Sequence, residues 1–317
     1  MLRVLFTGGG GAGNEALFRL LQTSYSPHFA DADVGAIDPG IPEGHRHALP
    51  WASDPEFVSK TAELCRRLSI DLLVPGVDEE LHLLASQTGA LGGTRLLLPC
   101  ADYVATMLDK MAMAQALESK NLPVPRTYRL SDRWEDVGFP CISKPRKGRG
   151  SRGVSTLQNS AEVASLRDRL GLSADDYILQ EKAIGQEYTV QMVASADATL
   201  HAIVPVKVDI KRGVTLRAET CAEPRVIAAC RAIHAALPAS GCYNIQLILT
   251  ADGHALPFEI NPRVSTTLCL VVAAGVDPIA IFNSAEQCEG GKLQSFECGL
   301  RLQRHWLNHF ISGAGYI

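Results

Sequence analysis

The sequence lacks the features that mark membrane and secreted proteins. No run of apolar residues approaches the roughly 18 needed to span a bilayer, because the longest charge-free run, residues 264–276, contains Ser265, Thr266 and Thr267. The first residues turn glycine-rich too early for a signal peptide. The nine cysteines are an odd set without CxxC spacing, so neither a disulfide framework nor a thiolate zinc site is indicated. We therefore expect a soluble protein of the cytoplasm.

A surplus of positive charge is also missing. The 30 basic and 34 acidic residues give a net charge of −4, which excludes the broad positive field of a general nucleic-acid binder. Five of the 30 basic residues nevertheless fall within residues 144–152, a stretch that contains no acid. We expect one local site for an anion and small-molecule partners, with no nucleic acid and no membrane. The sequence leaves open whether the protein forms a homodimer.

The pattern of apolar residues predicts an α/β protein. With 317 residues, of which 46% are hydrophobic, the chain is long enough for two or three packed units. In the first hundred residues, short apolar runs alternate with helical periodicity, as in βαβ units around a parallel sheet. The expected strands there are residues 2–7, 34–37, 72–74 and 96–98, and the expected helices are residues 15–21, 55–68 and 79–86.

The rest of the chain is expected to form two further units. A helical pattern starts near Asp102 and runs into the extended segment 123–125. The elements expected after it are strands over 141–144, 154–157 and 178–181, a helix over 161–170, strands over 188–194 and 200–208, a helix over 225–237, a hairpin over 243–261 and a strand near 296–302. We predict domains at residues 1–101, 102–184 and 185–317.

A glycine-rich turn, residues 8–13, follows the first strand and opens a helix. It satisfies G-x-G-x-x-G, and Asp38 ends the next expected strand about where a ribose-binding acid would lie. Glycines at such a turn let backbone amides approach an anion. On this motif alone, an NAD(P)-binding domain and a plain tight turn of a doubly wound domain are equally good interpretations.

The basic stretch forms a second motif, Lys-Pro-Arg-Lys-Gly-Arg-Gly-Ser-Arg-Gly-Val over residues 144–154. Its glycines expose backbone amides, and its basic side chains supply charged donors for phosphate oxygens. The lysine precedes the glycines, unlike the order of a P-loop. The motif favours a triphosphate-binding loop of a different geometry, with a solvated basic loop as the alternative.

The third motif is a predicted hairpin. Asp252-Gly253, a dipeptide preferred in two-residue type I′ turns, separates two alternating segments. If it forms the turn, four polar side chains share one face as two cross-strand pairs, Asn244 with Asn261 and Gln246 with Glu259. The opposite face would carry Ile245, Leu247, Leu249, Leu256, Phe258 and Ile260. Such convergent oxygens suit Mg²⁺. The alternative is a solvated hairpin face, and a bulge at Pro257 would shift this register.

Three further stretches accompany these motifs, Leu-Gln-Glu-Lys at 179–182, Gly-Gln-Glu-Tyr at 185–188 and Phe-Glu-Ile-Asn-Pro-Arg-Val-Ser at 258–265. The ordered set resembles the ATP-grasp superfamily, and within it the branch typified by the large chain of carbamoyl-phosphate synthetase. The resemblance covers nearly the whole chain. It implies an N-terminal Rossmann-like pre-ATP-grasp domain, which in this branch binds no dinucleotide. It also implies two α+β subdomains that clamp ATP. One is a lid with the glycine-rich loop, and the other is a C-terminal subdomain with the metal-binding hairpin.

The resemblance also implies roles for individual residues. The ATP-binding set would be Lys110, Lys144, Gly150, Ser151, Gly153, Val154, Glu181, Lys182, Ala183 and Glu187, with adenine read at 181–183 and ribose held by Glu187. Gln246, Glu259 and Asn261 would hold Mg²⁺ or Mn²⁺, and Arg263 and Lys144 would be catalytic. Many relatives carry an acid at the position of Gln246, so one carboxylate, Glu259, would serve the metal here.

The implied activity is that of an ADP-forming ligase. ATP would convert a carboxylate into an acyl-phosphate, which an amine or similar nucleophile would attack. No GxSxG elbow or nucleophilic-cysteine signature indicates a protein nucleophile. Candidate acceptor contacts are Asp78 and Glu79 for an ammonium group and Lys211 and Arg217 for a carboxylate. A phosphotransferase of the same fold and a non-catalytic nucleotide-binding regulator are the alternatives.

Overall fold

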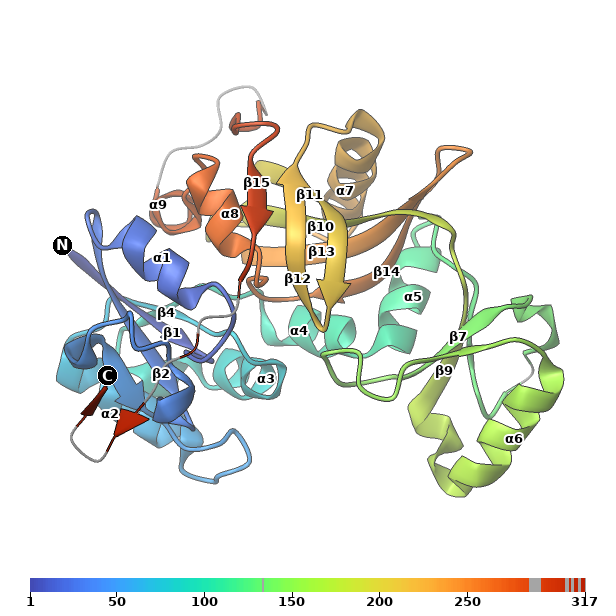
Figure 1. Ribbon diagram of the computed structural model, residues 1–317, viewed down its shortest axis with the longest axis horizontal. Helices are drawn as coiled ribbons and strands as arrows, with labels where there is room; N and C mark the ends of the chain where they lie inside the picture. Colours follow the sequence, from blue (N-terminus) through green and yellow to red (C-terminus); the bar gives the residue numbers. More distant parts are fainter. Residues whose placement is uncertain (133, 285–291, 306–307, 309–310, 313–314, 317) are drawn as a thin grey trace.

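The computed structural model describes residues 1–132, 134–284, 292–305, 308, 311–312 and 315–316 (Figure 1). The chain begins with a parallel sheet in the order β3-β2-β1-β4-β5. Its strands are β1 (Leu2–Thr7), β2 (Tyr25–Asp31), β3 (Arg46–Ala48), β4 (Leu72–Val74) and β5 (Arg95–Leu96). The connections contain α1 (Asn14–Leu21), α2 (Phe57–Leu68) and α3 (Asp78–Ser86), with 3₁₀ turns at Val34–Ala36, Glu43–His45 and Thr88–Leu91. The predicted doubly wound unit is confirmed.

The second strand, however, is not where the sequence pattern predicted it. Residues 34–37 begin as a 3₁₀ turn, stabilised by the carboxylate of Asp33, which accepts a hydrogen bond of 3.0 Å from the Gly35 amide. The strand lies earlier, at β2, where Pro27 and His28 interrupt the apolar run that would have marked it. Asp31, and not Asp38, therefore ends the second strand.

The next part of the chain starts with two helices and continues into an antiparallel sheet in the order β6-β9-β7-β8. Its elements are α4 (Ala101–Leu108), α5 (Lys110–Glu118), β6 (Thr127–Arg129), a 3₁₀ turn (Glu135–Val137), β7 (Cys141–Pro145), β8 (Ser155–Leu157), α6 (Ser160–Leu170), a second 3₁₀ turn (Gly171–Asp176) and β9 (Tyr177–Glu181). The expected single helix is divided at Asp109, whose carboxylate caps α5 by accepting from the amides of Met111 and Ala112.

The third part is built on a six-stranded antiparallel sheet in the order β14-β13-β10-β11-β12-β15. Its elements are β10 (Gly185–Ala194), β11 (Leu200–Arg212), β12 (Val214–Thr220), α7 (Pro224–Ala236), β13 (Gly241–Thr250), β14 (Ala255–Asn261), α8 (Leu268–Ala273), α9 (Pro278–Asn283) and β15 (Arg301–Gln303). A short pair, β16 (Ile311–Ser312) and β17 (Gly315–Tyr316), follows.

The two faces of the six-stranded sheet have different neighbours, because its side chains alternate. Even-numbered residues of β10 and odd-numbered residues of β13 form a core with α4, α5 and α7, which includes Val190, Ile245, Met113 and Val226. On the other face, Val193 and Cys242 pack with α8, α9 and the first sheet. The third part is thereby joined to the first sheet through one continuous core (Figure 1).

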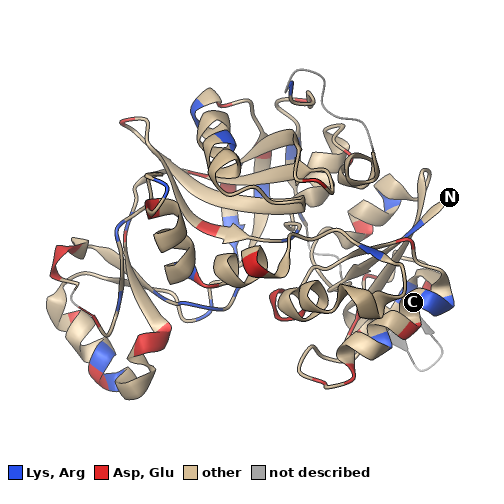
Figure 2. Ribbon diagram, turned by 180° about the vertical axis from the view of Figure 1, so that it is seen from behind, with Lys and Arg blue, Asp and Glu red and all other residues tan. Residues whose placement is uncertain are grey.

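No helix within the described residues is long and apolar enough to cross a membrane. Acidic and basic residues are mixed along all parts of the ribbon (Figure 2), as the small net charge predicts.

Candidate functional site

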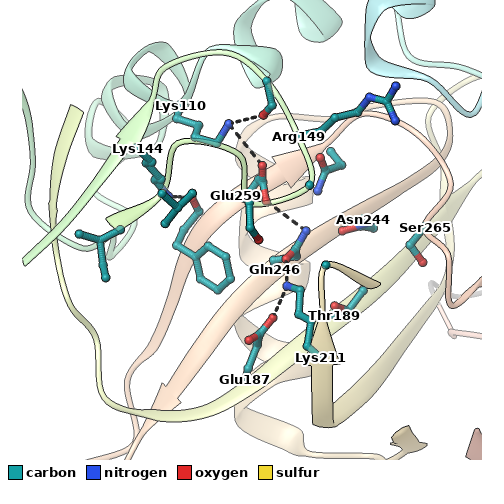
Figure 3. A pocket seen from close by; sticks show the side chains of 18 of the residues that line it. Lys110, Lys144, Arg149, Glu187, Thr189, Lys211, Asn244, Gln246, Glu259 and Ser265 are labelled. Carbon is teal, nitrogen blue, oxygen red and sulfur yellow. Dashed lines mark hydrogen bonds and ion pairs between the residues drawn. The ribbon is translucent and has the colours of Figure 1, made fainter. Parts of the chain in front are cut away.

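A cavity of about 360 Å³ lies between the four-stranded lid sheet, β6-β9-β7-β8, and the six-stranded sheet (Figure 3). Segments from all of the later motifs line it: the start of α5, β7 and the basic loop after it, the end of β9, the inner strands of the large sheet, the β13–β14 hairpin and residues 263–267. The motifs that the sequence places far apart therefore surround one space.

The β13–β14 hairpin contains the predicted polar pairs, but its turn and the register next to the turn differ from the prediction. The loop has three residues, with Thr250 opposite His254, and Gly253 adopts a positive φ of 93°. This shifts the pairing by one residue relative to the predicted two-residue turn. A bulge at Phe258 then shifts it back, so that Gln246 lies opposite Glu259 and Asn244 opposite Asn261.

The same bulge overturns part of the predicted apolar face. Phe258 lines the cavity, and its carbonyl and ring contact Lys144. Leu256 pairs with Ile248, a cavity-lining residue, whereas Pro257 and Ala255 turn toward the core. The physical reason is that the extra residue reverses the alternation of β14 between its two halves.

The strand register arranges the cavity floor in three rows. Glu187 pairs with Ile248 in the first row, and in the second Thr189 pairs with Gln246, which pairs in turn with Glu259. The third row is Gln191, Asn244 and Asn261. Neighbouring rows are two residues apart, which is about 7 Å along a strand. Figure 3 shows Asn244 beyond Gln246, toward Ser265.

Two lysines approach the second row from the other side of the cavity. Lys110 Nζ lies 3.4 Å from Glu259 Oε1 and donates to the Gly148 carbonyl at 2.8 Å. Lys144 Nζ donates to Gln180 Oε1 at 2.9 Å and to the Phe258 carbonyl at 3.0 Å. Burial lowers the pKa of Lys144 to about 8, although Glu259 opposes the shift. Both ammonium groups are thus buried, and that of Lys110 lies beside a carboxylate.

The basic loop between β7 and β8 is pliable but anchored at its base. Gly148, Gly150 and Gly153 have φ values of 110°, 69° and 70°, which favour glycine. Arg146 is held by Asp109 at 2.7 Å, so this cation supports the loop and does not line the cavity. Arg149, which does line it, reaches Glu79 at 3.1 Å.

The comparisons with known proteins agree with this architecture. The family model described as ATP-grasp in the biosynthetic pathway with Ter operon matches residues 173–306. The chain is 26% identical over 291 residues to a formate-dependent phosphoribosylglycinamide formyltransferase of Edwardsiella ictaluri (strain 93-146), covering 84% of this chain and 70% of that protein. It is 24% identical over 254 residues to the carbamoyl phosphate synthase large chain of Methanobrevibacter smithii, covering 73% of this chain but only 24% of that protein.

A solved structure shares the whole arrangement. The ADP complex of N5-carboxyaminoimidazole ribonucleotide synthetase superposes with a TM-score of 0.68 over 95% of this chain and 80% of that one, at 15% identity. The chain belongs to the ATP-grasp superfamily. The fold class and the family predicted from the motifs are confirmed.

Most residues that the sequence assigned to nucleotide and metal line this ATP-grasp cavity. They are Lys110, Lys144, Gly150, Ser151, Val154, Glu181, Lys182, Ala183, Glu187, Gln246, Glu259, Asn261 and Arg263. Gly153 lies beside it, under Pro145 and Tyr177. The Glu181 side chain pairs with Arg126 at 3.1 Å. Their roles toward ATP and a metal stay predictions.

The four acceptor candidates are distributed differently. Lys211 lies between the first and second rows, where its ammonium donates to Glu187 at 2.6 Å and to Gln246 at 2.8 Å. Asp78 and Glu79 pair with Arg263 and Arg149. Arg217 is exposed on β12 and does not line the cavity.

Three amides of the N-terminal glycine turn are already bonded within the protein. The amide of Gly9 donates to the Ala30 carbonyl at 2.9 Å, that of Gly10 to the Asp31 carboxylate at 2.9 Å and that of Gly11 to the Gly8 carbonyl at 2.8 Å. Amides used in this way are not available to a pyrophosphate, which favours the structural interpretation of the turn.

Three further residues in or beside the cavity received no role from the sequence. Gln180 holds Lys144 and is itself bonded to Thr127, and Gln191 accepts from the amide and hydroxyl of Ser265. Asn244 is buried, yet its side-chain oxygen has no hydrogen-bond partner within the described part of the chain. Gln180 lies in the Leu-Gln-Glu-Lys motif and Asn244 in the predicted hairpin, whereas only the alternation of β10 could have pointed to Gln191.

Proposed function

We propose that this protein is an ADP-forming ligase that activates a carboxylate as an acyl-phosphate. The observation that carries the proposal is the second row of the cavity, where the Glu259 carboxylate lies between Gln246 and the Lys110 ammonium. Lys144 and Arg263 line the same cavity. Phosphoryl transfer depends on positioned positive charge around the phosphoryl oxygens, and this arrangement supplies it.

The donors of the second and third rows fit a hard metal ion. Gln246, Glu259 and Asn261 offer only oxygen ligands from carboxylate and amide groups, the set that Mg²⁺ accepts together with phosphate oxygens. Within the described residues, no cluster of three His, Cys, Asp or Glu side chains replaces this donor set. Mg²⁺ held there, with ATP, would supply charge stabilisation to the phosphates.

The rows suggest how the substrates are arranged. Glu187 in the first row would hold the ribose, and the second row would lie at the γ-phosphate. The acceptor substrate would then lie at the third row, beside Asn244 and Arg263. The unpartnered oxygen of Asn244 suits an N–H or O–H group of the incoming nucleophile, because a buried acceptor without a partner is costly.

The chemistry would proceed in two steps. A carboxylate oxygen attacks the γ-phosphorus while the bond from that phosphorus to the β-bridging oxygen breaks, which gives acyl-phosphate and ADP. The nucleophile then attacks the acyl carbon, loses its proton, and expels phosphate. Lys110, Lys144 and Arg263 would neutralise charge on the phosphoryl oxygens during the first step. No side chain becomes covalently modified.

Phosphate release across a panel of amino acids and small carboxylic acids, tested singly and in pairs, examines this function. We expect ADP and phosphate in equal amounts only with a productive pair, and a loss of at least about 100-fold in Glu259→Ala. Glu63→Gln, which removes an exposed acid paired with Lys60 on α2, is the control. Full activity in Glu259→Ala would refute the metal assignment, and a stable phosphorylated product would identify a phosphotransferase instead.

A further inference from the structure

Arg263 is joined to the N-terminal unit by an ion pair that is nearly shielded from water. Its Nε donates to the carboxylate of Asp78, the first residue of α3, although 185 positions separate the two residues. The side chains are 14% and 11% exposed. Surface ion pairs contribute little, whereas a shielded, charge-assisted pair holds its members in one geometry.

The contacts leave one edge of the guanidinium for a ligand. An arginine side chain carries five N–H donors in a planar fork. Here Nε is used by Asp78, and Nη1 donates to the Val264 carbonyl at 3.0 Å. Within the described residues, Nη2 has no such partner, and Arg263 lines the cavity. The guanidinium group is therefore held by Asp78 and by the Val264 carbonyl, and its remaining N–H donors are available to phosphoryl or acyl oxygens.

The support behind Asp78 is rigid. Helix α3 is attached to the first sheet by the buried side chains of Leu81 and Leu84 and by a hydrogen bond from the Thr7 hydroxyl to the Glu80 carboxylate. Asp78 itself does not line the cavity. It cannot receive an acceptor ammonium without releasing Arg263, which argues against the acceptor role expected from the sequence.

The neighbouring acid offers a contrast within the same turn of helix. Glu79 pairs with Arg149 of the basic loop, but these side chains are 56% and 39% exposed. Two consecutive acids of α3 thus hold two arginines of the cavity, one firmly and one loosely. Only the shielded Asp78–Arg263 pair can fix the orientation of its guanidinium group.

We infer that Asp78 is the positioning residue for Arg263, so that the N-terminal unit completes the phosphoryl-transfer site of the other two. This inference rests on the proposed function, because it gives Arg263 a task at the transferring group. It gives the N-terminal unit a specific role, which is to orient the guanidinium group of Arg263, a residue of the third part of the chain.

The test uses MgADP with and without aluminium fluoride, which mimics the transferring phosphoryl group. In Asp78→Asn we expect the affinity for MgADP to stay within twofold of wild type, while the tightening caused by aluminium fluoride falls at least tenfold. Asp78→Glu should restore part of that tightening. Arg263→Lys should lose it, and adding Asp78→Asn to Arg263→Lys should cause no further loss. Glu63→Gln is the control variant.

A second readout needs no nucleotide. The Nε–H group of Arg263, labelled with nitrogen-15, should exchange slowly with water in wild type, disappear in Arg263→Lys and exchange faster in Asp78→Asn. Unchanged exchange, or an unchanged response to aluminium fluoride in Asp78→Asn, would overturn the positioning role alone. A wild-type protein that binds no MgADP would overturn the proposed function, and the positioning role with it.

Discussion

At the scale of single residues, Lys144 combines burial with a proposed role that needs charge. Its ammonium contacts a side-chain oxygen of Gln180, a backbone carbonyl and the face of Phe258, but no carboxylate at hydrogen-bond distance is among its contacts. Desolvation therefore outweighs the attraction of Glu259, and its pKa falls to about 8. The charge of the site is consequently sensitive to mildly alkaline pH.

This gives a pH dependence with a definite sign. Lys144 is charged below its pKa of about 8, and phosphate binding favours the charged form, so ATP affinity should be full below pH 8 and decline above it. Between pH 7 and 9 we expect about a tenfold loss, the ratio set by one proton and this pKa.

Calorimetric titration of ATP across this range measures the effect. Lys144→Arg, which stays charged to higher pH, should bind less tightly because the larger side chain must fit a buried site, but with a flat profile. A wild-type affinity that does not change between pH 7 and 9 would contradict the assignment of Lys144 to the phosphates.

At the scale of elements, the β13–β14 hairpin shows how a local irregularity positions chemistry. The three-residue loop and the bulge at Phe258 each move the register by one residue, in opposite directions. The two shifts cancel, so Glu259 and Asn261 face the cavity. The bulge also directs the Phe258 carbonyl to Lys144.

Two single-residue deletions in this hairpin should therefore differ sharply. Deleting Ala251 leaves Asp252-Gly253 as a two-residue loop, which type I′ geometry accommodates, so the pairing from Thr250 onward should survive. We expect unfolding midpoint and MgATP binding close to wild type. Deleting Phe258 leaves Gln246 opposite Glu259 but removes the backbone carbonyl and the ring that contact Lys144, so MgATP binding should fall strongly.

Thermal unfolding and nucleotide titration of both variants provide the comparison. The Ala251 deletion is the matched control for chain shortening. Equal losses in the two variants would mean that the bulged residue Phe258 has no special part in holding Lys144.

At the scale of the whole molecule, two packed parts line the cavity, the first part contacts its arginines through ion pairs, and the three parts are joined by different kinds of contact. The first sheet shares an apolar core with the large sheet, and it also holds Arg263 through Asp78. The lid has its own core around Leu130 and Cys141. Its basic loop reaches the first unit through the half-exposed Arg149–Glu79 pair, a contact worth at most about 1 kcal/mol.

The loop should therefore open readily until nucleotide is bound. We expect trypsin to cleave the ligand-free protein after Lys147 or Arg152, which are exposed, and MgATP to slow this cleavage several-fold by engaging the loop amides and cations. Mass spectrometry of a digestion time course gives the rates, and cleavage elsewhere in the chain is the internal reference. Equal rates at these two sites with and without MgATP would argue against closure of the loop on phosphate.

Local sequence patterns predicted much of the fold, and the predictions were wrong where the local pattern was weak. The strands β1, β4, β10 and β13 carry clear apolar runs or alternation and lie where expected. Strand β2 carries Pro27 and His28 in its interior, and its burial comes from neighbours that are distant in sequence. The helix expected across Asp109 divides because that side chain caps the second half, a choice that the apolar spacing does not encode.

The sequence by itself determined the superfamily, the order of the motifs and which polar residues share a face of the hairpin, because alternation along a strand is a local property. Only the tertiary structure decided how the charges are used. Asp78 meets Arg263, Lys211 meets Glu187 and Arg146 meets Asp109 across long stretches of chain, and residue types alone do not specify such pairs. Packing brings these groups within reach of each other, and it places the Asp78–Arg263 pair where it is shielded from water and an unpaired charge is costly.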